Sequence, residues 1–488
     1  MNKLLTKSTL SATIALTLIA CGDGGDGGGG GGVAGIGGSG FISSGSVTGF
    51  GSVFVNGVEF ATSSTVFDID DSGSGSQDDL AVGMVVTVNG TVNDDGVTGN
   101  ATSISFDDQL QGPVSNITAV IADPDEENRS FTSLGTKVLI NRFNTSFDVS
   151  GTIIAPNFNF DGIKDEDHVE ISGFFNAAGE LVATRVELKA TAFSTSNIVE
   201  LKGSITGLIN TSFNINGINI NASTATIDDL PNGLAEGAVV EVKGTCSDAS
   251  CSTLNATRVE GQSGFDDADK ISVEGLITDF VSSSDFNING ISVNASAANL
   301  SPGTLVLRNG ARVEVEGPLS NNAIQALTVE LRGGDAKVHA TVSSVDPVTG
   351  NFEVTFTGNN TQTQTIAVTV TTATEMEDHV AASDFVRVRG FENESGGITA
   401  TRVEVRSVDD VIVQGNLQAF VANTSIQILG VTFGIDTASE TEFENTSDAE
   451  ITQGQFSNLA PVGTLVKVKD RNDRPVFGVA DEIEIETP

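Results

Sequence analysis

One short pattern recurs along the whole chain: an alternating apolar and polar run that ends in glycine, a loop, and a second run that carries an alanine about ten residues after the glycine. The clearest copy is VEVKGTCSDASCSTLNATRVE (240–260), with Gly244 and Ala256. Five related positions pair Gly90 with Ala101, Gly173 with Ala183, Gly317 with Ala326, Gly390 with Ala400, and Asp470 with Ala480. Successive alanines lie roughly 70 to 80 residues apart, a period longer than a solenoid coil. The pattern therefore predicts six small domains in tandem.

Each copy contains about five strand-like runs separated by Gly, Asn, Asp or Pro, and no helical periodicity. In the third copy they are GSITGLI (203–209), SFNINGINI (212–220), TATI (224–227), AVVEVKG (238–244) and LNATRVE (254–260). Alternation places Val240 and Val242 on one face of a half-buried strand. Period two fails after Ala256, because Val259 lies three residues on, so we expect a bulge near Thr257–Arg258. Ile398, Ala400 and Val403 repeat this break in the fifth copy.

Five short strands with a bent last strand, in units of about 70 residues, are typical of a small, partly open barrel of the oligonucleotide/oligosaccharide-binding (OB) type. A two-sheet sandwich is the alternative, but it normally needs about seven strands and about 100 residues. We predict an all-β fold, a tandem array of OB-like barrels behind an export signal and a tether. The expected boundaries are 1–20 signal peptide, 21–40 lipidated cysteine and linker, and repeats at 41–109, 110–190, 199–262, 270–333, 335–408 and 411–488.

The N-terminus has the features of a bacterial lipoprotein signal. Lys3 and Lys7 precede an apolar run from Leu10 to Ala20 that is too short to span a bilayer as a mature helix. Leu18-Ile19-Ala20-Cys21 resembles the lipobox, which implies cleavage before Cys21 and acylation of that residue by diacylglycerol and a further acyl chain such as palmitate. Gly22, in place of an aspartate, implies export to the outer membrane. The following Gly-rich segment predicts a flexible tether.

Several segments resemble the bacterial domain-of-unknown-function family 5666 (DUF5666), whose members are often lipoproteins with tandem copies. The resemblance rests on NGVEF (56–60), LAVGMVVTVNG (80–90) and the AT-x-[VI]-E endings, and it covers most of the chain after residue 41. The second copy, with insertions at 123–129 and 159–167, and the sixth, with Asp470 in place of glycine, match less well. The family name implies no activity.

Charge and aromatic content disfavour two ligand classes that OB-like barrels bind. The chain has 64 acidic and 24 basic residues, a net charge of −40, which repels nucleic acid and anionic lipid. It contains no Trp and no Tyr, so the usual stacking platforms for sugars are missing. Oligosaccharide or nucleic-acid binding is therefore the less favoured alternative, and we expect no nucleic-acid partner.

Two cysteines remain after Cys21 is assigned to lipid. Cys246 and Cys251 lie in one loop of the third copy, and in an oxidising compartment we expect them to form a disulfide. Free thiols or a redox or metal role are the alternatives, but no C-x-x-C spacing or neighbouring histidine supports the latter. His168, His339 and His379 occupy non-equivalent positions and do not resemble a zinc site.

An acidic loop in the first copy resembles an EF-hand loop. Asp68, Asp70, Ser72, Ser76 and Asp79 fall at alternate ligand positions around Gly73, which suggests a calcium site as the one possible cofactor. The last position is Asp rather than Glu, and the flanking runs are strand-like, so a solvated acidic loop is the alternative. The acidic segments 123–127 and 161–167 are weaker variants of this pattern.

No nucleophile turn or apolar carboxylate pair indicates catalysis, so we do not expect an enzyme. We expect a cell-envelope lipoprotein attached to the membrane by its lipid, either periplasmic or surface-exposed. It would act as a binding, spacer or scaffold module for an envelope protein or polysaccharide. A calcium-responsive adhesion module is the first alternative.

Overall fold

The structure is a computed structural model that describes residues 40–70, 74–118, 128–151, 153–262, 264–265, 268–357, 363–376, 379–393, 395–436, 441–446, 449–471 and 478–486. These residues fall within one compact unit, Ser39–Pro488. The expected signal peptide, Cys21 and most of the Gly-rich tether lie outside the described residues.

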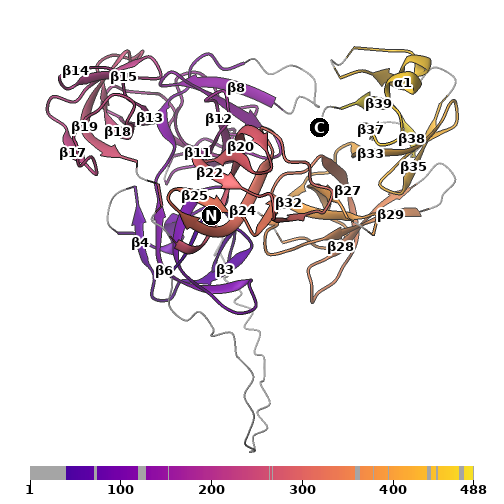
Figure 1. Ribbon diagram of the computed structural model, residues 1–488. Coiled ribbons are helices and arrows are strands. Elements are labelled where there is room, and N and C mark those ends of the chain that lie inside the picture. The colour runs from indigo at the N-terminus through magenta and orange to yellow at the C-terminus, as the bar shows by residue number, and fades with distance from the viewer. Residues whose placement is uncertain are drawn as a thin grey trace, which may run out of the picture. The chain divides into compact units, whose positions relative to one another are not determined.

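The strands fall into six successive groups, here called repeats 1 to 6 (Figure 1). Repeat 1 contains β1 (Phe41–Phe50), β2 (Val53–Val55), β3 (Val58–Ala61), β4 (Val66–Ile69), the 3-10 turn η1 (Gln77–Asp79), β5 (Val85–Val92) and β6 (Thr98–Phe106). Repeat 2 contains β7 (Leu110–Pro113), β8 (Asn128–Ser133), β9 (Thr136–Asn141), β10 (Ser146–Val149), β11 (His168–Phe175) and β12 (Leu181–Ala190). Repeat 3 contains β13 (Ile198–Ser204), β14 (Thr206–Ile209), β15 (Ser212–Ile215), β16 (Ile218–Asn221), β17 (Thr226–Asp228), β18 (Val239–Cys246) and β19 (Thr253–Gly261).

The second half of the chain repeats this arrangement. Repeat 4 contains β20 (Ala268–Ser282), β21 (Asp285–Ile288), β22 (Ile291–Asn294), β23 (Asn299–Ser301), β24 (Arg312–Ser320), β25 (Ala323–Gln325) and β26 (Thr328–Leu331). Repeat 5 contains β27 (Ala336–Val345), β28 (Phe352–Thr357), β29 (Thr363–Thr369), β30 (Glu375–Met376), β31 (Phe385–Glu392) and β32 (Ile398–Arg406). Repeat 6 contains β33 (Val411–Val421), β34 (Ser425–Ile428), β35 (Val431–Ile435), β36 (Glu442–Glu444), α1 (Gln453–Leu459), β37 (Leu465–Asp470), β38 (Val479–Ala480) and β39 (Glu482–Ile485).

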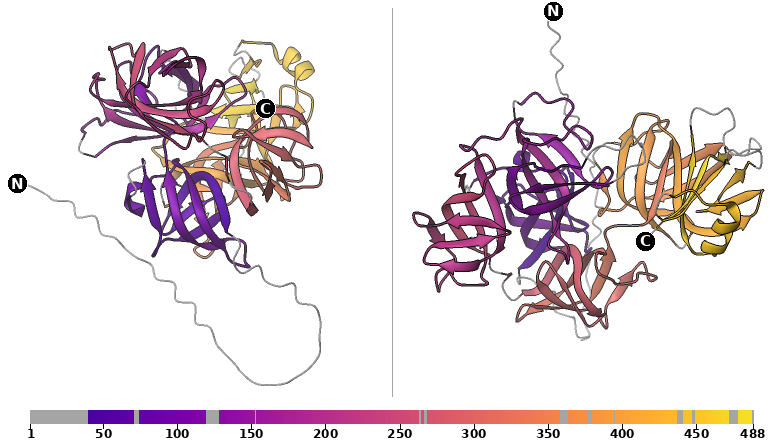
Figure 2. Two further views of the ribbon diagram at one scale, coloured as in Figure 1. Left: turned by 60° about the vertical axis from the view of Figure 1, so that its left-hand side comes forward. Right: turned by 90° about the horizontal axis from the view of Figure 1, so that it is seen from above.

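Repeat 1 shows how each barrel closes. β1, β2 and β3 form an antiparallel meander, β6 joins β3 in parallel, and β5 lies antiparallel to both β6 and β1. The sheet order β2-β3-β6-β5-β1 returns to β2, so the five strands form a closed OB-like barrel, and β4 adds in parallel to β6. The all-β, OB-like prediction is confirmed, and Figure 2 shows the barrels from two further sides.

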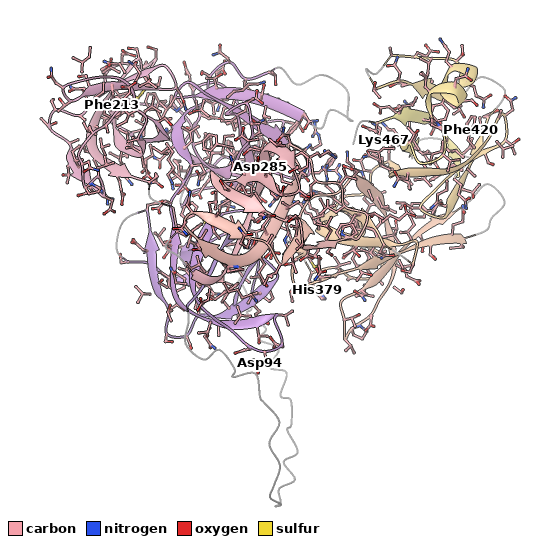
Figure 3. All side chains as sticks on the ribbon, in the orientation of Figure 1. Asp94, Phe213, Asp285, His379, Phe420 and Lys467 are labelled. Carbon is pink, nitrogen blue, oxygen red and sulfur yellow. A yellow bond between two sulfur atoms is a disulfide. The ribbon has the colours of Figure 1, made fainter. Side chains whose placement is uncertain are left out.

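A phenylalanine fills the centre of most barrels. Phe60, Phe213, Phe286 and Phe433 come from the second hairpin of repeats 1, 3, 4 and 6, and each is at most 1% exposed. Phe213 is labelled in Figure 3. The aromatic content of the chain therefore serves largely the cores, because burying such a ring contributes about 1.5 to 3 kcal/mol.

The recurring glycine and alanine mark a β-bulge. In repeat 3, Lys243 is opposite Arg258 whereas Gly244 is opposite Ala256, so Thr257 has no opposite partner. A Cβ atom on Gly244 would lie 2.2 Å from the backbone oxygen of Asn255, so only glycine fits there. The bulged Thr257 donates its hydroxyl to the carbonyl of Lys243 at 3.0 Å. The predicted bulge is confirmed.

The same bulge is present in three further repeats. The residues skipped by the register are Thr102, Thr184 and Thr401. Thr102 and Thr401 donate to the carbonyl that precedes their glycine, as Thr257 does. The alternation of the last strand is broken because the strand must bend at this point to close the barrel.

Repeat 6 accommodates Asp470 by a different local structure. The last strand is divided into β38 and β39, and Asp481 between them donates its amide to the carbonyl of Lys469. The Asp470 carboxylate is buried and accepts the amide of Gly478 at 2.6 Å. Burial raises the pKa of Asp470 to about 6.

The first strands join the barrels in pairs. β7 pairs antiparallel with β13, β27 pairs antiparallel with β33, and β1 pairs in parallel with β20. Repeats 2 and 3, 5 and 6, and 1 and 4 therefore share three sheets of 13 strands each. The pairing of repeats 1 and 4 skips the two repeats between them in sequence.

One helix departs from the expected pattern. α1 has seven residues, and Thr452 and Gln455 form a reciprocal capping box at its start. Phe456 on this helix is fully buried, with its ring centroid 5.1 Å from that of Phe420 and 5.2 Å from that of Phe443. A helix of two turns is too short to produce a periodic hydrophobic pattern, so it could not be predicted from the sequence.

Candidate functional site

The joined first strands align charged side chains into rows across two barrels. In these strands the inward positions are apolar, such as Val388, Val338 and Val413, and the alternate positions face outward. Because registers run unbroken through the junction, cross-strand neighbours on the outer face continue from one barrel to the next. Two such faces are formed, one by repeats 2 and 3 and one by repeats 5 and 6.

The face of repeats 2 and 3, here called the acidic face, carries glutamates in repeat 2 and on β13, followed by cationic residues on β18 and β19. Its central row contains, from β12 to β19, Glu187, Glu170, Gln111, Glu200, Lys243 and Arg258. Lys243 Nζ lies 2.5 Å from Glu200 Oε1, and Lys189 Nζ lies 2.7 Å from Glu170 Oε2. Burial raises the pKa of Glu200 to about 7, although the ammonium of Lys243 opposes this shift.

Asp108 is the least compensated carboxylate of this face. It lies between β6 and β7, is 1% exposed, and neither carboxylate oxygen has a hydrogen-bond partner among the described residues. Burial raises its pKa well above the usual value, and the charges of Glu200 and Glu170 raise it further. A proton on Asp108 therefore stabilises the junction.

The face of repeats 5 and 6, here called the basic face, has the opposite sign. Its central row contains, from β32 to β39, Arg402, Arg389, Lys337, Gln414, Lys467 and Glu484. The next row contains Glu404, Arg387, His339, Ile412, Lys469 and Glu482. Lys467 is labelled in Figure 3. This concentration of cations stands out in a chain of net charge −40.

Ion pairs at the two ends of the basic face offset part of its charge. Arg402 Nη1 lies 2.7 Å from Glu375 Oε1, and its Nη2 lies 2.8 Å from Glu404 Oε1. Lys467 pairs with Glu484 at the other end. His339, between these ends, is 3% exposed, and burial followed by the charges of Arg387 and Lys337 holds its pKa well below 6.5.

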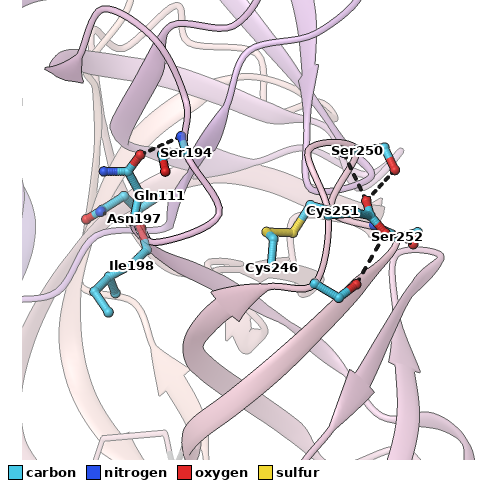
Figure 4. Close-up of a disulfide and its surroundings, with 10 residues drawn as sticks. Gln111, Ser194, Asn197, Ile198, Cys246, Ser250, Cys251 and Ser252 are labelled. Atoms are coloured by element: carbon cyan, nitrogen blue, oxygen red, sulfur yellow. Dashed lines mark hydrogen bonds between the residues drawn. A yellow bond between two sulfur atoms is a disulfide. The ribbon is translucent and has the colours of Figure 1, made fainter.

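The loop of repeat 3 between β18 and β19 contains the predicted disulfide (Figure 4). Cys246 and Cys251 are bonded, with Cα atoms 4.8 Å apart, and both side chains are buried. Asp248 organises the loop, since its carboxylate accepts from Ser250 Oγ at 2.6 Å and from Ser252 Oγ at 2.7 Å. These hydrogen bonds, the one from Ser250 first, hold the pKa of Asp248 well below its usual range.

Comparison with known families identifies the repeated unit. Six segments match the family described as "Domain of unknown function (DUF5666)": residues 39–105, 111–187, 202–260, 274–330, 339–404 and 414–484. Together they span more than half of the chain. The chain belongs to the DUF5666 family.

Other comparisons add little to this assignment. No curated protein matches this DUF5666 chain significantly. Among solved structures, one titled "drosophila Unr CSD456" is 12% identical and covers 62% of this chain and 99% of its own length, with a TM-score of 0.12. A TM-score this low supports no conclusion about the chain.

The residues of the expected calcium loop do not converge on one point among those the structure describes. Asp68 lies on β4, Asp70 follows it in the left-handed region with φ of 50°, and Ser72 lies outside the described residues. Ser76 and Asp79 form the capping box of η1, in which Asp79 Oδ2 accepts the Ser76 amide at 2.8 Å. The capping box gives Ser76 and Asp79 a structural role, and calcium binding stays a prediction.

Asp70 has a role that the sequence did not suggest. Its charge contributes to the raised pKa values of Glu170 and Glu200, after burial as the main cause. Asp70 therefore belongs electrostatically to the acidic face of repeats 2 and 3. A pattern of ligands within one loop could not reveal this, because Glu170 and Glu200 lie about 100 and 130 positions further along the chain.

Three carboxylates do converge in repeat 6. Oxygens of Glu444, Glu482 and Glu484 lie within 4.8 Å of one another, the one such group among the described residues. Arg471 Nη2 lies 3.1 Å from Glu482 Oε2, and Lys467 pairs with Glu484, so cationic side chains already neutralise much of this charge. We assign no metal to this group.

The histidines occupy three separate environments in this DUF5666 chain. His168 Nε2 lies 3.1 Å from Gln111 Nε2, and burial lowers its pKa to about 4. His339 lies on the basic face, and His379 precedes β31. None belongs to the convergent acidic group found among the described residues. Among the residues that the structure describes, no helix is long and apolar enough to cross a membrane.

Proposed function

We propose that the chain is a non-enzymatic lipoprotein of the outer membrane in which six DUF5666 barrels form a scaffold or spacer held to lipid through Cys21. The observation that carries this proposal is the joining of barrels by their first strands into three continuous sheets. An exposed strand edge normally invites further pairing, and here that edge joins neighbouring barrels instead.

Side chains at two of these junctions support the same role. Gln111 Nε2 donates to the carbonyl of Ile198 at 2.9 Å, and Gln414 Nε2 donates to the carbonyl of Asp335 at 2.8 Å. Two small cavities lined by described residues of these barrels each hold about 10 Å³, room for about one water molecule. A substrate of ordinary size would need a far larger pocket of about 300 Å³ or more.

Membrane attachment is tested by labelling cells with a palmitate analogue and fractionating their envelopes. The wild-type chain should carry label and sediment with the outer membrane. Cys21→Ser should lose both properties, whereas Cys246→Ser/Cys251→Ser, which also removes thiols, should keep them. Label on the C21S chain, or sedimentation with the inner membrane, would refute the proposed address.

The scaffold role has its own test. The purified chain, immobilised and exposed to envelope extract, should retain a specific envelope protein or polysaccharide and should turn over no substrate in a broad hydrolase panel. Turnover that survives repurification would show that the chain is an enzyme and overturn the proposal.

A further inference from the structure

Repeats 2, 3 and 5 share a group of side chains beside the bulge, here called the bulge site. Each site has the bulged threonine, the arginine that follows it, and two carboxylates that pair with this arginine. One carboxylate lies on the short strand that adds in parallel, and the other lies two residues beyond the arginine. The three groups are Arg185 with Asp148 and Glu187, Arg258 with Asp228 and Glu260, and Arg402 with Glu375 and Glu404.

The bulge site of repeat 2 holds a loop of repeat 1. Thr184 Oγ1 donates to the carbonyl of Gly83 at 2.6 Å, and Arg185 Nη1 donates to the carbonyl of Val82 at 3.4 Å. Both acceptors are neutral backbone oxygens in the loop before β5. The contact is close, since a Cβ atom on Gly83 would lie 2.8 Å from the backbone oxygen of Thr184. It leaves the Arg185 side chain 7% exposed.

The bulge site of repeat 5 is also covered by another repeat, whereas that of repeat 3 is more exposed. Arg402 Nη2 donates to Ser146 Oγ of repeat 2, and its side chain is 6% exposed. The Arg258 side chain of repeat 3 is 30% exposed instead, and Thr257 beside it is exposed too. Thr257 donates its hydroxyl within its own repeat, to the carbonyl of Lys243. Repeat 3 thus presents at the surface the residue types that bind a loop in repeat 2.

Repeat 6 carries a loop that resembles the one bound by repeat 2. Residues 459–463, LAPVG, lie before β37, as residues 80–83, LAVG, lie before β5. Gly463 and Gly83 both have positive φ, 94° and 87°, and each donates its amide to a carbonyl on the first strand of its own repeat. The two loops therefore follow the same course at the glycine.

The loop of repeat 6 is exposed at the position where the loop of repeat 1 is bound. Beyond its chain neighbours, no described residue has an atom within 4 Å of a Cβ atom added to Gly463. Val462, which corresponds to Val82, is 72% exposed. The chain therefore presents a second set of the two surfaces that meet between repeats 1 and 2, and this second set is not joined within one copy.

The close fit at the bulge site selects a glycine. In repeats 2 and 5 the corresponding loop position is Glu166 and Ser383, both with positive φ. Their Cβ atoms would meet the backbone of a bulge site, as one on Gly83 would meet Thr184. The loops of repeats 2 and 5 are therefore unsuited to this contact.

The corresponding loops of repeats 3 and 4 have the glycine but differ beside it. The residue before the glycine is Glu236 in repeat 3 and Asn309 in repeat 4, and both side chains accept backbone amides of their own repeat. Arg308 precedes Asn309, and its charge would repel Arg258. The loop of repeat 6 adds no charge, as in the contact between repeats 1 and 2, so it suits the bulge site of repeat 3 best.

We propose that copies of this chain associate head to tail, with residues 461–463 of one copy bound to the bulge site of repeat 3 in the next. Thr257 Oγ1 turns from its own repeat to the carbonyl of Gly463, because a threonine hydroxyl has one proton to donate. Arg258 keeps its two carboxylates and donates to the carbonyl of Val462. The two surfaces differ, so each copy binds one neighbour at each, and the assembly grows as a chain or closes as a ring. This association goes beyond the scaffold role and does not depend on attachment to a membrane.

Sedimentation of the full-length chain in a density-matched detergent tests the association. The average mass of the wild-type particle should rise with protein concentration. Arg258→Gln and Val462→Asp should each raise the dissociation constant at least tenfold, the second because its carboxylate would face Asp228 and Glu260. Val348→Asp is the matched control, since Val348 is 89% exposed in repeat 5 and lies outside both surfaces, so this variant should associate as the wild type does.

Cross-linking identifies the two surfaces. Chains with Thr257→Cys and chains with Val462→Cys are purified separately, mixed and mildly oxidised, and a disulfide-linked dimer should form. Thr102→Cys mixed with Val462→Cys is the control, because Thr102 is an exposed bulge threonine that Ser103 follows instead of an arginine. This second mixture should give only background cross-linking.

A wild-type chain that remains monomeric up to its solubility limit would overturn the proposal. Equal association of the wild type, R258Q and V462D would do the same, and so would equal cross-linking of the T257C and T102C chains to V462C. None of these results bears on lipid attachment at Cys21, which the labelling experiment tests separately.

Discussion

Single residues in this chain are constrained by where the strands bend and where charge is buried. Gly317 illustrates the first constraint, because a Cβ atom there would lie 2.2 Å from the backbone oxygen of Gln325. Asp108 illustrates the second, because its carboxylate is buried without a hydrogen-bond partner among the described residues. Each gives a prediction for one substitution.

Gly317→Ala should destabilise repeat 4 by about 1 to 3 kcal/mol, because the added methyl group must displace the backbone of Gln325 and Ala326. Gly303→Ala in the same repeat is the control, since nothing lies within 4 Å of its added Cβ. Chemical denaturation of the two variants measures the difference. Equal midpoints would show that this position does not require glycine.

Asp108→Asn should change how stability depends on pH. Burial raises the pKa of Asp108 in the folded chain, whereas the unfolded chain releases this proton above about pH 4. The stabilising contribution of the protonated carboxyl is thus complete below that pH and is lost as pH rises through the folded-state pKa. D108N removes this loss. Its free energy of unfolding should therefore exceed that of the wild type by about 1 to 3 kcal/mol at high pH and equal it near pH 4.

Denaturation series from pH 4 to pH 9 check this prediction. Glu236→Gln in repeat 3 is a useful control, because its carboxylate accepts two backbone amides at the surface and its pKa is lowered. That variant should lose stability at neutral pH, the opposite sign. Parallel curves for D108N and wild type would contradict the assignment of Asp108.

At the scale of elements, the hairpin of β18 and β19 combines a bulge with a covalent link. The disulfide of Cys246 and Cys251 closes a very short loop, and loop entropy gives it about 2 kcal/mol of stability. Cys246→Ser/Cys251→Ser, or reduction of the wild type, should lower the free energy of unfolding of repeat 3 by that amount and lower its melting temperature accordingly. An unchanged melting profile on reduction would show that the hydrogen bonds of Asp248 alone hold the loop.

The acidic loop after β4 is the element for the calcium hypothesis. If calcium binds there, millimolar calcium raises the melting temperature of the chain, because a ligand of the native state stabilises it by about 2.7 kcal/mol at 100 times its dissociation constant. Asp68→Asn should abolish the rise, whereas Asp94→Asn, an exposed acid of the same repeat, should preserve it. A calcium-independent melting temperature would leave the capping box as the role of Ser76 and Asp79.

The local sequence pattern predicted the barrels well because the residues that close each barrel lie within short stretches of sequence. The bulge at Thr257 followed from three apolar residues with broken alternation, and the disulfide from two cysteines in one loop. The acidic and basic faces were missed because their rows join strands from different repeats. Gln414 of repeat 6 is opposite Lys337 of repeat 5, and no single-repeat pattern contains that pairing. Helix α1 had a signal, Thr452 three residues before Gln455, that its short length concealed.

At the scale of the whole molecule, the repeats form three pairs rather than six independent domains in the compact unit described. Repeats 1 and 4 are joined by pairing of Phe41–Ser44 with Lys270–Val273. Ser46 reinforces this junction, since its amide and hydroxyl donate to Glu274 Oε2 at 2.7 Å and 2.8 Å. Stability should therefore be shared within a pair, as it is between neighbours in repeat arrays.

Gly317→Ala tests this sharing by amide hydrogen exchange. Opening of repeat 4 removes the partner of β1, so exchange should accelerate in β1 and β5 of repeat 1, even though repeats 2 and 3 separate it from repeat 4 in sequence. In repeat 3, whose first strand pairs with β7, exchange in β13 and β18 should change much less. Gly303→Ala should leave all four strands as in the wild type. Faster exchange confined to repeat 4 would mean that the barrels unfold independently. A larger increase in exchange rate in repeat 3 than in repeat 1 would likewise mean that first-strand pairing does not couple them.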